Sequence, residues 1–418
     1  MRSIELFTGA GGLALGTHHA GFEHLAVVEI DHDSCDTLRL NKARGQETGI
    51  AWPIAEANVT TFNFSEYATS TIDLLAGGAP CQPFSLGGKH AGDADKRNMF
   101  PAVFRAVREL RPRAFLLENV RGLTRESFLP YFEYITEQLA FPYVDEALEE
   151  GWLAHKERLA EYHAAGDAVG GPPWNQKSAC RYDVCYKVYN VADFGVPQER
   201  HRVFIVGFRH DLGIQWHFLP PTHSQDALLY AQYVDGSYWD EHGLTRRSTP
   251  SRVAGRVAKL ALFPKPRASR WRTVRDAIGD LPEPIDYDAN PLVSDHVGIP
   301  DARAYPGHTG SPWDWPAKAI KAGDHGNPGG ENMLRRDDGS VRYFTVRELA
   351  RLQTFPDEWH FANSWTESRR QLGNAVPVMV ANILAQHVRS ELDRIDQGAL
   401  ERRRRQRGQP APIAVTAG

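Results

Sequence analysis

Short apolar runs alternate with stretches of helical periodicity over the first third of the chain. The runs at residues 4–7 and 24–30 predict strands, and residues 11–21 between them predict a helix. Two more apolar runs, at 71–78 and 113–120, predict further strands. Strands that alternate with helices are typical of a parallel sheet with helices on both faces. The pattern therefore predicts an α/β fold.

The pattern continues to about residue 210 with three further features. An amphipathic segment at residues 98–112 predicts the helix between the third and fourth strands. Residues 127–165 are helical in pattern, and we interpret them as an insertion. Residues 182–195 and 202–208 predict two more strands, close enough in sequence to form a hairpin. We expect this hairpin at the edge of the sheet.

The periodic pattern is lost between residues 213 and 342, where Trp, Pro, Gly and Arg become frequent. This stretch is long enough to form a second domain. Helical periodicity returns at residues 345–355 and again at 376–392. The last stretch, residues 397–418, contains the run ERRRRQRG and predicts a basic, disordered tail.

Composition narrows the class of protein. The chain has 418 residues, of which 42% are hydrophobic and 24% charged, as in ordinary soluble globular proteins. No apolar run is long enough to span a bilayer, and the sequence MRSIELFTGAGG begins directly with a predicted strand instead of a signal peptide. We therefore expect a cytoplasmic protein that does not bind a membrane.

The cysteines argue against a metal site. The chain has four, with no CxxC spacing, which favours free thiols in a reducing compartment over disulfides or a zinc site. The zinc deaminases share a Pro-Cys pair, but their signature continues as PCxxC. Here Cys81 is followed by Gln-Pro-Phe, so the second ligand is missing. We expect no metal.

Basic residues are concentrated in one stretch, although the formal net charge is only −4. Between His242 and Arg275 there are ten Lys and Arg residues and no Asp or Glu, and Arg246, Arg247 and Arg252 lie at the start of this basic run. Such a run can be a solvated face. It can also be a phosphate-binding surface.

A glycine-rich turn follows the first predicted strand and opens a helix. Gly9, Gly11 and Ala14 satisfy the spacing G-x-G-x-x-G/A, and Glu29 ends the second strand twenty residues after Gly9. Glycines let the backbone approach a ligand at a helix N-terminus, and the acid can accept both hydroxyls of a ribose. The turn therefore favours a cofactor that contains a nucleoside. A dinucleotide and S-adenosylmethionine both fit this description.

Three further features carry chemistry. Cys81 lies in the loop GGAPCQPFSLGGK, where it can be a nucleophile, a metal ligand or an incidental thiol. Glu118 ends a buried strand, where loss of water should raise the pKa of its carboxyl, although it can also simply pair with an arginine. Arg200 and Arg202 occupy alternate positions at a strand start, and they can bind an anion or carbonyl oxygens, or lie on the surface.

These motifs together resemble the DNA (cytosine-5) methyltransferases, specifically the S-adenosylmethionine-dependent modification enzymes of prokaryotes. The resemblance covers residues 2–212 and 343–396. It rests on motifs that occur in one order: ELFTGAGGLALG, VVEID, GGAPCQPFSLGGK, DKRNMF, LLENVRGL, FGVPQERHRVFIVG, RELARLQTFPDEW and QLGNAVP. It implies a Rossmann-like class I methyltransferase fold with a mostly parallel, doubly wound sheet. It also assigns 213–342 to a smaller, irregular target-recognition domain.

The resemblance implies a role for each catalytic side chain. Cys81 would add as thiolate to carbon 6 of cytosine, which makes carbon 5 nucleophilic. Glu118 would hydrogen-bond the ring nitrogen and amine of the base, and Arg202 its carbonyl oxygen. Arg200 would support this site. The base must leave the duplex for this chemistry, because a paired cytosine is out of reach.

The resemblance also implies two binding sets. Glu29 would hold the ribose of S-adenosylmethionine, Ile30 would pack on its adenine, and Asn58 stands where an aspartate usually contacts the adenine amine. Phe100 or its neighbour Met99 replaces a leucine expected near the cofactor. The remaining cofactor residues are Phe7, Gly9, Ala10, Gly12, Pro80, Asn374 and Val376, and the expected DNA contacts are Gln82, Ser85, Lys89, Arg246, Arg247 and Arg252.

Three other functions are weighed against this one. A tRNA-methylating relative would share the catalytic motifs but carry a Cys-Phe-Thr signature, and this chain has no Cys-Phe pair. A dinucleotide-dependent oxidoreductase would leave Cys81, Glu118 and Arg202 without a role. A DNA-binding relative without activity would be expected to lack Cys81 or Glu118. We therefore expect a monomeric enzyme that acts on double-stranded DNA, with a restriction endonuclease as a candidate partner.

Overall fold

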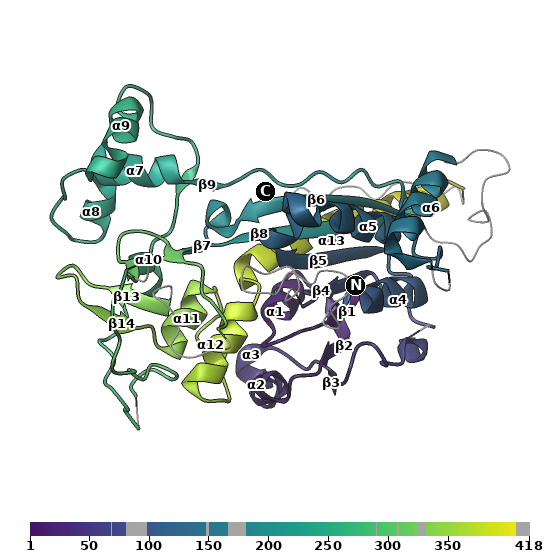
Figure 1. Ribbon diagram of the computed structural model, residues 1–418, viewed down its shortest axis with the longest axis horizontal. Coiled ribbons are helices and arrows are strands. Elements are labelled where there is room, and N and C mark those ends of the chain that lie inside the picture. The colour runs from purple at the N-terminus through teal and green to yellow at the C-terminus, as the bar shows by residue number, and fades with distance from the viewer. Residues whose placement is uncertain are drawn as a thin grey trace.

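A seven-stranded sheet forms the centre of the molecule (Figure 1), with the strand order β3-β2-β1-β4-β5-β8-β6. The computed structural model describes residues 1–67, 69–80, 98–147, 150–165, 181–289, 291–306, 309–323 and 332–406. The strands of this sheet are β1 Arg2–Leu6, β2 Glu23–Glu29, β3 Ile54–Glu56, β4 Leu74–Gly77, β5 Ala114–Val120, β6 Tyr182–Asn190 and β8 His201–Arg209. Strands β1 to β5 are parallel, whereas β8 and β6 are antiparallel to their neighbours. The predicted parallel sheet and edge hairpin are both confirmed.

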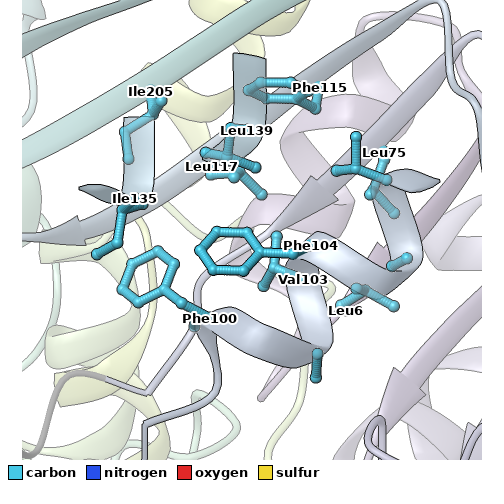
Figure 2. Packing of buried hydrophobic residues seen from close by; sticks show 14 of the residues in the cluster. Leu6, Leu75, Phe100, Val103, Phe104, Phe115, Leu117, Ile135, Leu139 and Ile205 are labelled. Atoms are coloured by element: carbon cyan, nitrogen blue, oxygen red, sulfur yellow. The ribbon is translucent and has the colours of Figure 1, made fainter. Parts of the chain in front are cut away.

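Helices cover both faces of the sheet because its central strands are buried at nearly every position. On β5, Phe115 and Leu117 belong to one hydrophobic cluster, whereas Leu116 between them belongs to another, as the alternation of a strand requires. Figure 2 shows the first cluster, in which these two side chains lie opposite Phe104. Its helices are α4 Phe100–Leu110 and α5 Leu129–Ala140, and those of the other face are α1 Gly12–His19 and α13 Val378–Gln406.

The interpretation of residues 127–165 as an insertion is wrong for α5. Its buried residues Tyr134, Ile135 and Leu139 lie in the same hydrophobic cluster as strands β1, β4, β5 and β8. The hairpin β6–β8 widens the sheet beyond β5, and α5 covers the apolar face that this creates. Helix α6, Gly151–Ala165, packs on α5 in turn and buries Leu159 there.

The C-terminal boundary also differs from the prediction. Helix α13 continues to Gln406, whereas the sequence predicts disorder from residue 397. Ala, Leu, Glu and Arg dominate residues 399–405, and all are good helix formers, so an existing helix extends through them at little cost. Residues 407–418 lie outside the described part of the chain.

Residues 223–271 form a lobe with its own small core, which includes Leu228, Tyr238, Trp239 and Trp271. The lobe contains β9 His223–Ser224, α7 Gln225–Tyr233, α8 Ser237–Glu241, α9 Ser251–Leu260 and β10 Ser269–Arg270. In Figure 1 it stands apart from the sheet at the side where β8 begins. A short parallel pair, β9 with β10, closes its base.

The rest of the predicted second domain does not pack as a separate body. Val274, Ile278 and Leu334 belong to the same hydrophobic cluster as Ala10 and Leu349, so this cluster crosses the predicted boundary at residue 342. The elements that contribute to this cluster include α10 Val274–Ile278, β12 Ala317–Lys318, β13 Met333–Arg335, α11 Val346–Leu352, α12 Trp365–Asn374 and α2 His32–Ala43. Three short elements adjacent to these in the chain are β11 Ser311–Pro312, β14 Val341–Tyr343 and α3 Gly45–Thr48. Strand β12 also pairs with β7, Gln198–Glu199, directly before β8.

Two general expectations can be compared with the described residues. Both cysteines in this part of the chain, Cys35 and Cys185, are free thiols, as predicted, while Cys81 and Cys180 lie outside it. Among the described helices, none combines the length and the apolar character needed to cross a membrane.

Candidate active site

The glycine-rich turn between β1 and α1 is held in shape by Glu29. One carboxylate oxygen accepts the Gly9 amide at 2.7 Å, and the other accepts the amides of Ile30 and Asp31 at 2.8 and 2.9 Å. Phe7 and Gly9 both have positive φ, at 55° and 53°. Such a conformation is unusual for a residue with a side chain, so the turn at Phe7 is strained. Glu29 therefore shapes the turn, and about one of its roughly four acceptor positions remains for a ligand.

Space beside this turn is open. A Cβ atom built on Gly9 would meet no atom within 4 Å. Ile30, next to Glu29, is 63% exposed, an unusual state for a large apolar side chain at the end of a buried strand. Both observations agree with a ligand that lies between the turn and Ile30, as the sequence predicts.

Asn58 follows β3, whose Glu56 pairs in register with Glu29. Its side chain is exposed, and its amide oxygen accepts hydrogen bonds from the Thr60 amide at 3.0 Å and the Thr60 hydroxyl at 2.8 Å. The Asn58 amide oxygen, which was expected to accept a hydrogen bond from the adenine amine, is therefore already hydrogen-bonded to Thr60. The predicted adenine contact stays a prediction and requires this oxygen to be shared, or the amide to turn.

The C-terminal motif lies against the same turn. A Cβ atom on Gly12 would approach the Val376 carbonyl oxygen to 2.3 Å, so only glycine fits there. This confirms the expectation that the motif folds back beside the glycine loop. Asn374 is exposed, whereas Val376 and Ala10 are buried. Gly12 thus serves close packing, and its predicted cofactor contact is untested.

Glu118 and Arg202 meet across the antiparallel strands β5 and β8. The Arg202 Nε lies 2.8 Å from Glu118 Oε1, and both side chains are largely buried. Burial raises the pKa of the Glu118 carboxyl, and the opposing pull of Arg202 and Arg200 is smaller. Gly78 leaves room here, since a Cβ atom on it would lie 3.2 Å from Glu118 Oε2. The site therefore combines a carboxyl whose pKa is raised by burial with an adjacent guanidinium.

Asn119 fixes the loop that leads to Cys81. Its amide nitrogen donates to the Ala79 carbonyl at 3.1 Å, two residues before the cysteine. Because Asn119 follows Glu118 directly on β5, this hydrogen bond holds the start of the loop close to Glu118. Pro80 is exposed, as a residue at a ligand-facing loop should be. Cys81, Gln82, Ser85 and Lys89 lie in residues 81–97, outside the described part of the chain.

Arg200 has a different role from Arg202. It is almost completely buried and donates to the carbonyl oxygens of Ile320 at 2.9 Å, Gly373 at 2.6 Å and Ala375 at 3.1 Å. Of the alternatives left open by the sequence, carbonyl binding is confirmed. Arg200 therefore joins the start of β8 to the motif beside the glycine turn.

Two buried glutamines extend this network, and the sequence did not identify them as site residues. Gln198 donates to Gln353 at 3.3 Å and accepts from the Ile320 amide at 3.1 Å. Gln353 donates to the Leu372 carbonyl at 2.5 Å. Gln198 begins the sequence QERHR and Gln353 lies in the motif RELARLQTFPDEW, which were the available signals.

Phe100 is buried at the start of α4 and packs in the hydrophobic cluster of Figure 2, beside Phe104. Its neighbour Met99 is only partly buried. Of the two residues proposed near the cofactor, only Met99 has a partly accessible side chain that a ligand could contact. The predicted contact of Phe100 is untested.

Several cations of the basic run already have carboxylate partners within the protein. Arg246 pairs with Asp240 at 2.8 Å and Arg247 with Asp337 at 2.6 Å, whereas Arg252 stacks over the Trp315 ring with its guanidinium carbon 5.6 Å from the centroid. Carboxylates thus neutralise two of the three expected DNA contacts, one of them from a segment distant in sequence. A cleft of about 400 Å³ opens between the lobe and the β13–β14 hairpin, and its lining includes Trp239, Arg247, Arg252, Trp313, Trp315 and Arg335.

Comparison with known proteins agrees with this arrangement. The model of the C-5 cytosine-specific DNA methylase family matches residues 1–141, 174–260 and 294–390. The chain is 30% identical to the type II methyltransferase M.NgoMIV of Neisseria gonorrhoeae, over 92% of this chain and 96% of that protein. It is 31% identical to M.Eco47II of Escherichia coli, over 94% and 80% of the two chains.

A solved structure shows the same fold. A mutant of DNMT2 from Spodoptera frugiperda superposes with a TM-score of 0.55 at 15% identity, over 93% of this chain and 99% of that one. The chain therefore shares the overall fold of that protein. The family model matches most of the length of this chain. The chain therefore belongs to the C-5 cytosine-specific DNA methylase family, and it methylates carbon 5 of cytosine in DNA.

Proposed function

We propose that this enzyme transfers the methyl group of S-adenosylmethionine to a cytosine that is flipped out of a specific double-stranded DNA sequence. The observation that carries the proposal is the Glu118–Arg202 pair at the ends of β5 and β8, next to the loop that leads to Cys81. The names of the relatives further support a role as the modification enzyme of a restriction system, with a cognate endonuclease as a separate partner.

The cofactor residues fit an adenosyl group. Glu29 keeps acceptor capacity beside the open space at Gly9, and Ile30 offers an exposed apolar face for a flat ring. When bound, S-adenosylmethionine would supply a methyl group on a positively charged sulfur. The chain itself would hold the ribose at Glu29. It would close the methionine end with Asn374 and Val376, which lies beside Gly12.

The side chains of the site would activate the base in a defined order. The Cys81 thiolate forms a bond to carbon 6, and the electron pair displaced toward the ring nitrogen is stabilised by the protonated Glu118 and by Arg202 at the carbonyl oxygen. Carbon 5 would then act as the nucleophile and form a bond to the methyl carbon, while the electron pair of the broken carbon–sulfur bond would stay on the sulfur of the departing cofactor. Loss of the carbon 5 proton restores the double bond and breaks the bond to Cys81.

Target recognition would reside in residues 213–342. Arg252 is the strongest candidate of the three arginines for a DNA contact, because Arg246 and Arg247 must first leave Asp240 and Asp337. Base edges in the major groove carry the sequence information, and phosphate contacts only position the protein. We infer that the enzyme acts as a monomer, since one chain holds the complete set of proposed site residues.

Trapping of the covalent intermediate tests this proposal. Bisulfite sequencing of plasmid from expressing cells first identifies the target site. DNA with 5-fluorocytosine at that site should then form a stable protein–DNA adduct, because fluorine cannot leave carbon 5 as a cation. The adduct should appear as a shifted band in denaturing electrophoresis and should require S-adenosylmethionine.

Two cysteine variants make the test specific. Cys81→Ser should abolish the adduct and methylation, because a serine hydroxyl is far less ionised than a thiol at neutral pH. Cys185→Ser removes an exposed thiol on β6 and should leave both unchanged. An adduct with Cys81→Ser, or its loss with Cys185→Ser, would overturn the assignment.

A further inference from the structure

The end of α9 exposes two large apolar side chains next to each other. Leu262 is 81% exposed and Phe263 is 67% exposed. Their backbone amides donate to the carbonyls of Lys259 and Leu260, both at 3.1 Å, so a further helical turn holds the pair at the end of the helix. Single exposed apolar residues are common on protein surfaces, but two large ones side by side on a small lobe favour a contact with a partner.

Free cations flank this apolar pair. Six cations of the basic run have carboxylate partners: Arg246, Arg247, Arg256, Lys265, Arg270 and Arg275. Lys259 and Arg267, which precede and follow the pair in sequence, have no ion pair with any described residue and are exposed. Positive charge around an apolar tip is complementary to a polyanion that also offers apolar surface, as DNA does between its base pairs.

The pair is a feature of this chain that the shared family pattern does not cover. The family model matches up to residue 260 and resumes at residue 294, so Leu262 and Phe263 lie in the stretch between. The lobe that carries them stands at the side of the molecule where β8 begins with Arg202 nearby (Figure 1). A long ligand bound at the Glu118–Arg202 site can therefore extend toward the lobe.

We propose that Leu262 and Phe263 act as an apolar wedge that inserts between base pairs of the DNA outside the target cytosine, while Lys259 and Arg267 hold the adjacent phosphates. Leucine and phenylalanine wedges unstack a base step and kink the duplex, and the phosphate contacts keep the bent DNA against the protein. The wedge would thus bend the DNA that the enzyme methylates, and this inference rests on DNA being the substrate.

The double variant Leu262→Ala/Phe263→Ala tests the wedge. A duplex with the target site and a dye at each end reports bending by energy transfer, and fluorescence anisotropy reports affinity. The variant should remove the bend and weaken binding by about tenfold, because apolar contact with the bases is lost. Leu153→Ala is the matched control, because this side chain is also exposed but belongs to α6, which lies at the opposite end of the molecule from the lobe (Figure 1). It should change neither quantity.

The salt dependence of DNA binding distinguishes the contribution of the apolar pair from that of the two cations. Lys259→Ala and Arg267→Ala should each reduce the slope of log K against log salt by about 0.9, whereas Leu262→Ala/Phe263→Ala should leave that slope unchanged. Arg256→Ala lies on the same helix but has Asp226 as its partner, so its effect on the slope should be smaller. Equal slopes for all these variants and the wild type would contradict the phosphate contacts.

Two outcomes would overturn the wedge. One is wild-type bending and affinity in Leu262→Ala/Phe263→Ala. The other is a wild-type dimer in sedimentation that becomes monomeric in this variant, which would make a second copy of the chain the partner. Formation of the Cys81 adduct at saturating DNA tests the proposed function independently of the wedge. It should form with the double variant, and its absence from the wild type would contradict the methylation mechanism and leave the wedge unaffected.

Discussion

At the scale of single residues, strand register explains the chemistry of the site. Val120 on β5 pairs with Arg202 on β8, so the side chain of Glu118, two residues earlier, lies on the same face and reaches the guanidinium at 2.8 Å. Of the two alternatives for Glu118, the arginine-paired carboxylate is therefore observed, and the catalytic acid stays a prediction with which this pairing is compatible. Burial has the larger effect on the pKa of Glu118, which stays above its usual value despite the ion pair.

The raised pKa of Glu118 predicts a pH profile. The proton on this carboxyl is retained below the raised pKa and lost as the pH rises through it, whereas Cys81 gains thiolate with rising pH. The single-turnover rate of the wild type should therefore pass through a maximum and fall on the alkaline side. Glu118→Gln cannot lose a proton, so it should show only the rising limb, at a rate lower by about 10²–10⁴-fold.

Single-turnover methylation measured across the pH range checks this prediction. Binding of the target duplex by Glu118→Gln, followed by anisotropy, should stay close to that of the wild type and serves as the control for folding. An alkaline fall that persists in Glu118→Gln would assign the limb to another group.

At the scale of elements, the packing of α1 on α13 depends on one small residue. A Cβ atom on Gly16 would lie 2.4 Å from the Ala381 Cβ and 2.7 Å from the Asn382 backbone nitrogen. The two helices therefore approach so closely that α1 has no room for a side chain at Gly16. This contact joins the N-terminal glycine turn to the C-terminal part of the chain.

We expect Gly16→Ala to destabilise the protein by about 1–3 kcal/mol, because α13 must move to accept the methyl group. Gly255→Ala on α9 is the matched control, since a Cβ atom there meets nothing within 4 Å. It should stabilise its helix by up to about 1 kcal/mol through helix propensity. Chemical denaturation followed by circular dichroism measures both. A Gly16→Ala variant as stable as Gly255→Ala would mean that the helices separate at no cost.

Elements governed by local interactions were predictable from the sequence. The patterns TVRD and TVRE begin α10 and α11, and in both the threonine and the acid form a reciprocal capping box. The apolar runs likewise located the buried strands. Helix α5 was misjudged because its apolar face is explained only by the β6–β8 hairpin that it covers. The pairing of Arg247 in the basic run was beyond prediction, because its partner Asp337 lies 90 residues away in the chain.

At the scale of the whole molecule, Arg200 connects the two ends of the active site. Its partners Ile320, Gly373 and Ala375 come from segments more than 100 residues away, and the next residue, Val376, rests against Gly12 in the glycine turn. The start of β8 therefore holds both Arg202, which pairs with Glu118, and Arg200, which holds the motif beside the glycine turn. We regard Arg200 as a positioning residue that acts through Asn374 and Val376.

Comparison of two conservative substitutions tests this division of roles. Lysine keeps the charge of arginine but lacks its planar fork, so Arg200→Lys cannot serve three carbonyls arranged for a guanidinium. Loss of one such charged hydrogen bond should cost about 1.5–3 kcal/mol of stability. Because the freed carbonyls flank Asn374, Arg200→Lys should also weaken binding of S-adenosylmethionine in calorimetric titration. Arg202→Lys should keep cofactor affinity and lose single-turnover rate. If both variants lost cofactor affinity equally, Arg200 would not act through the C-terminal motif.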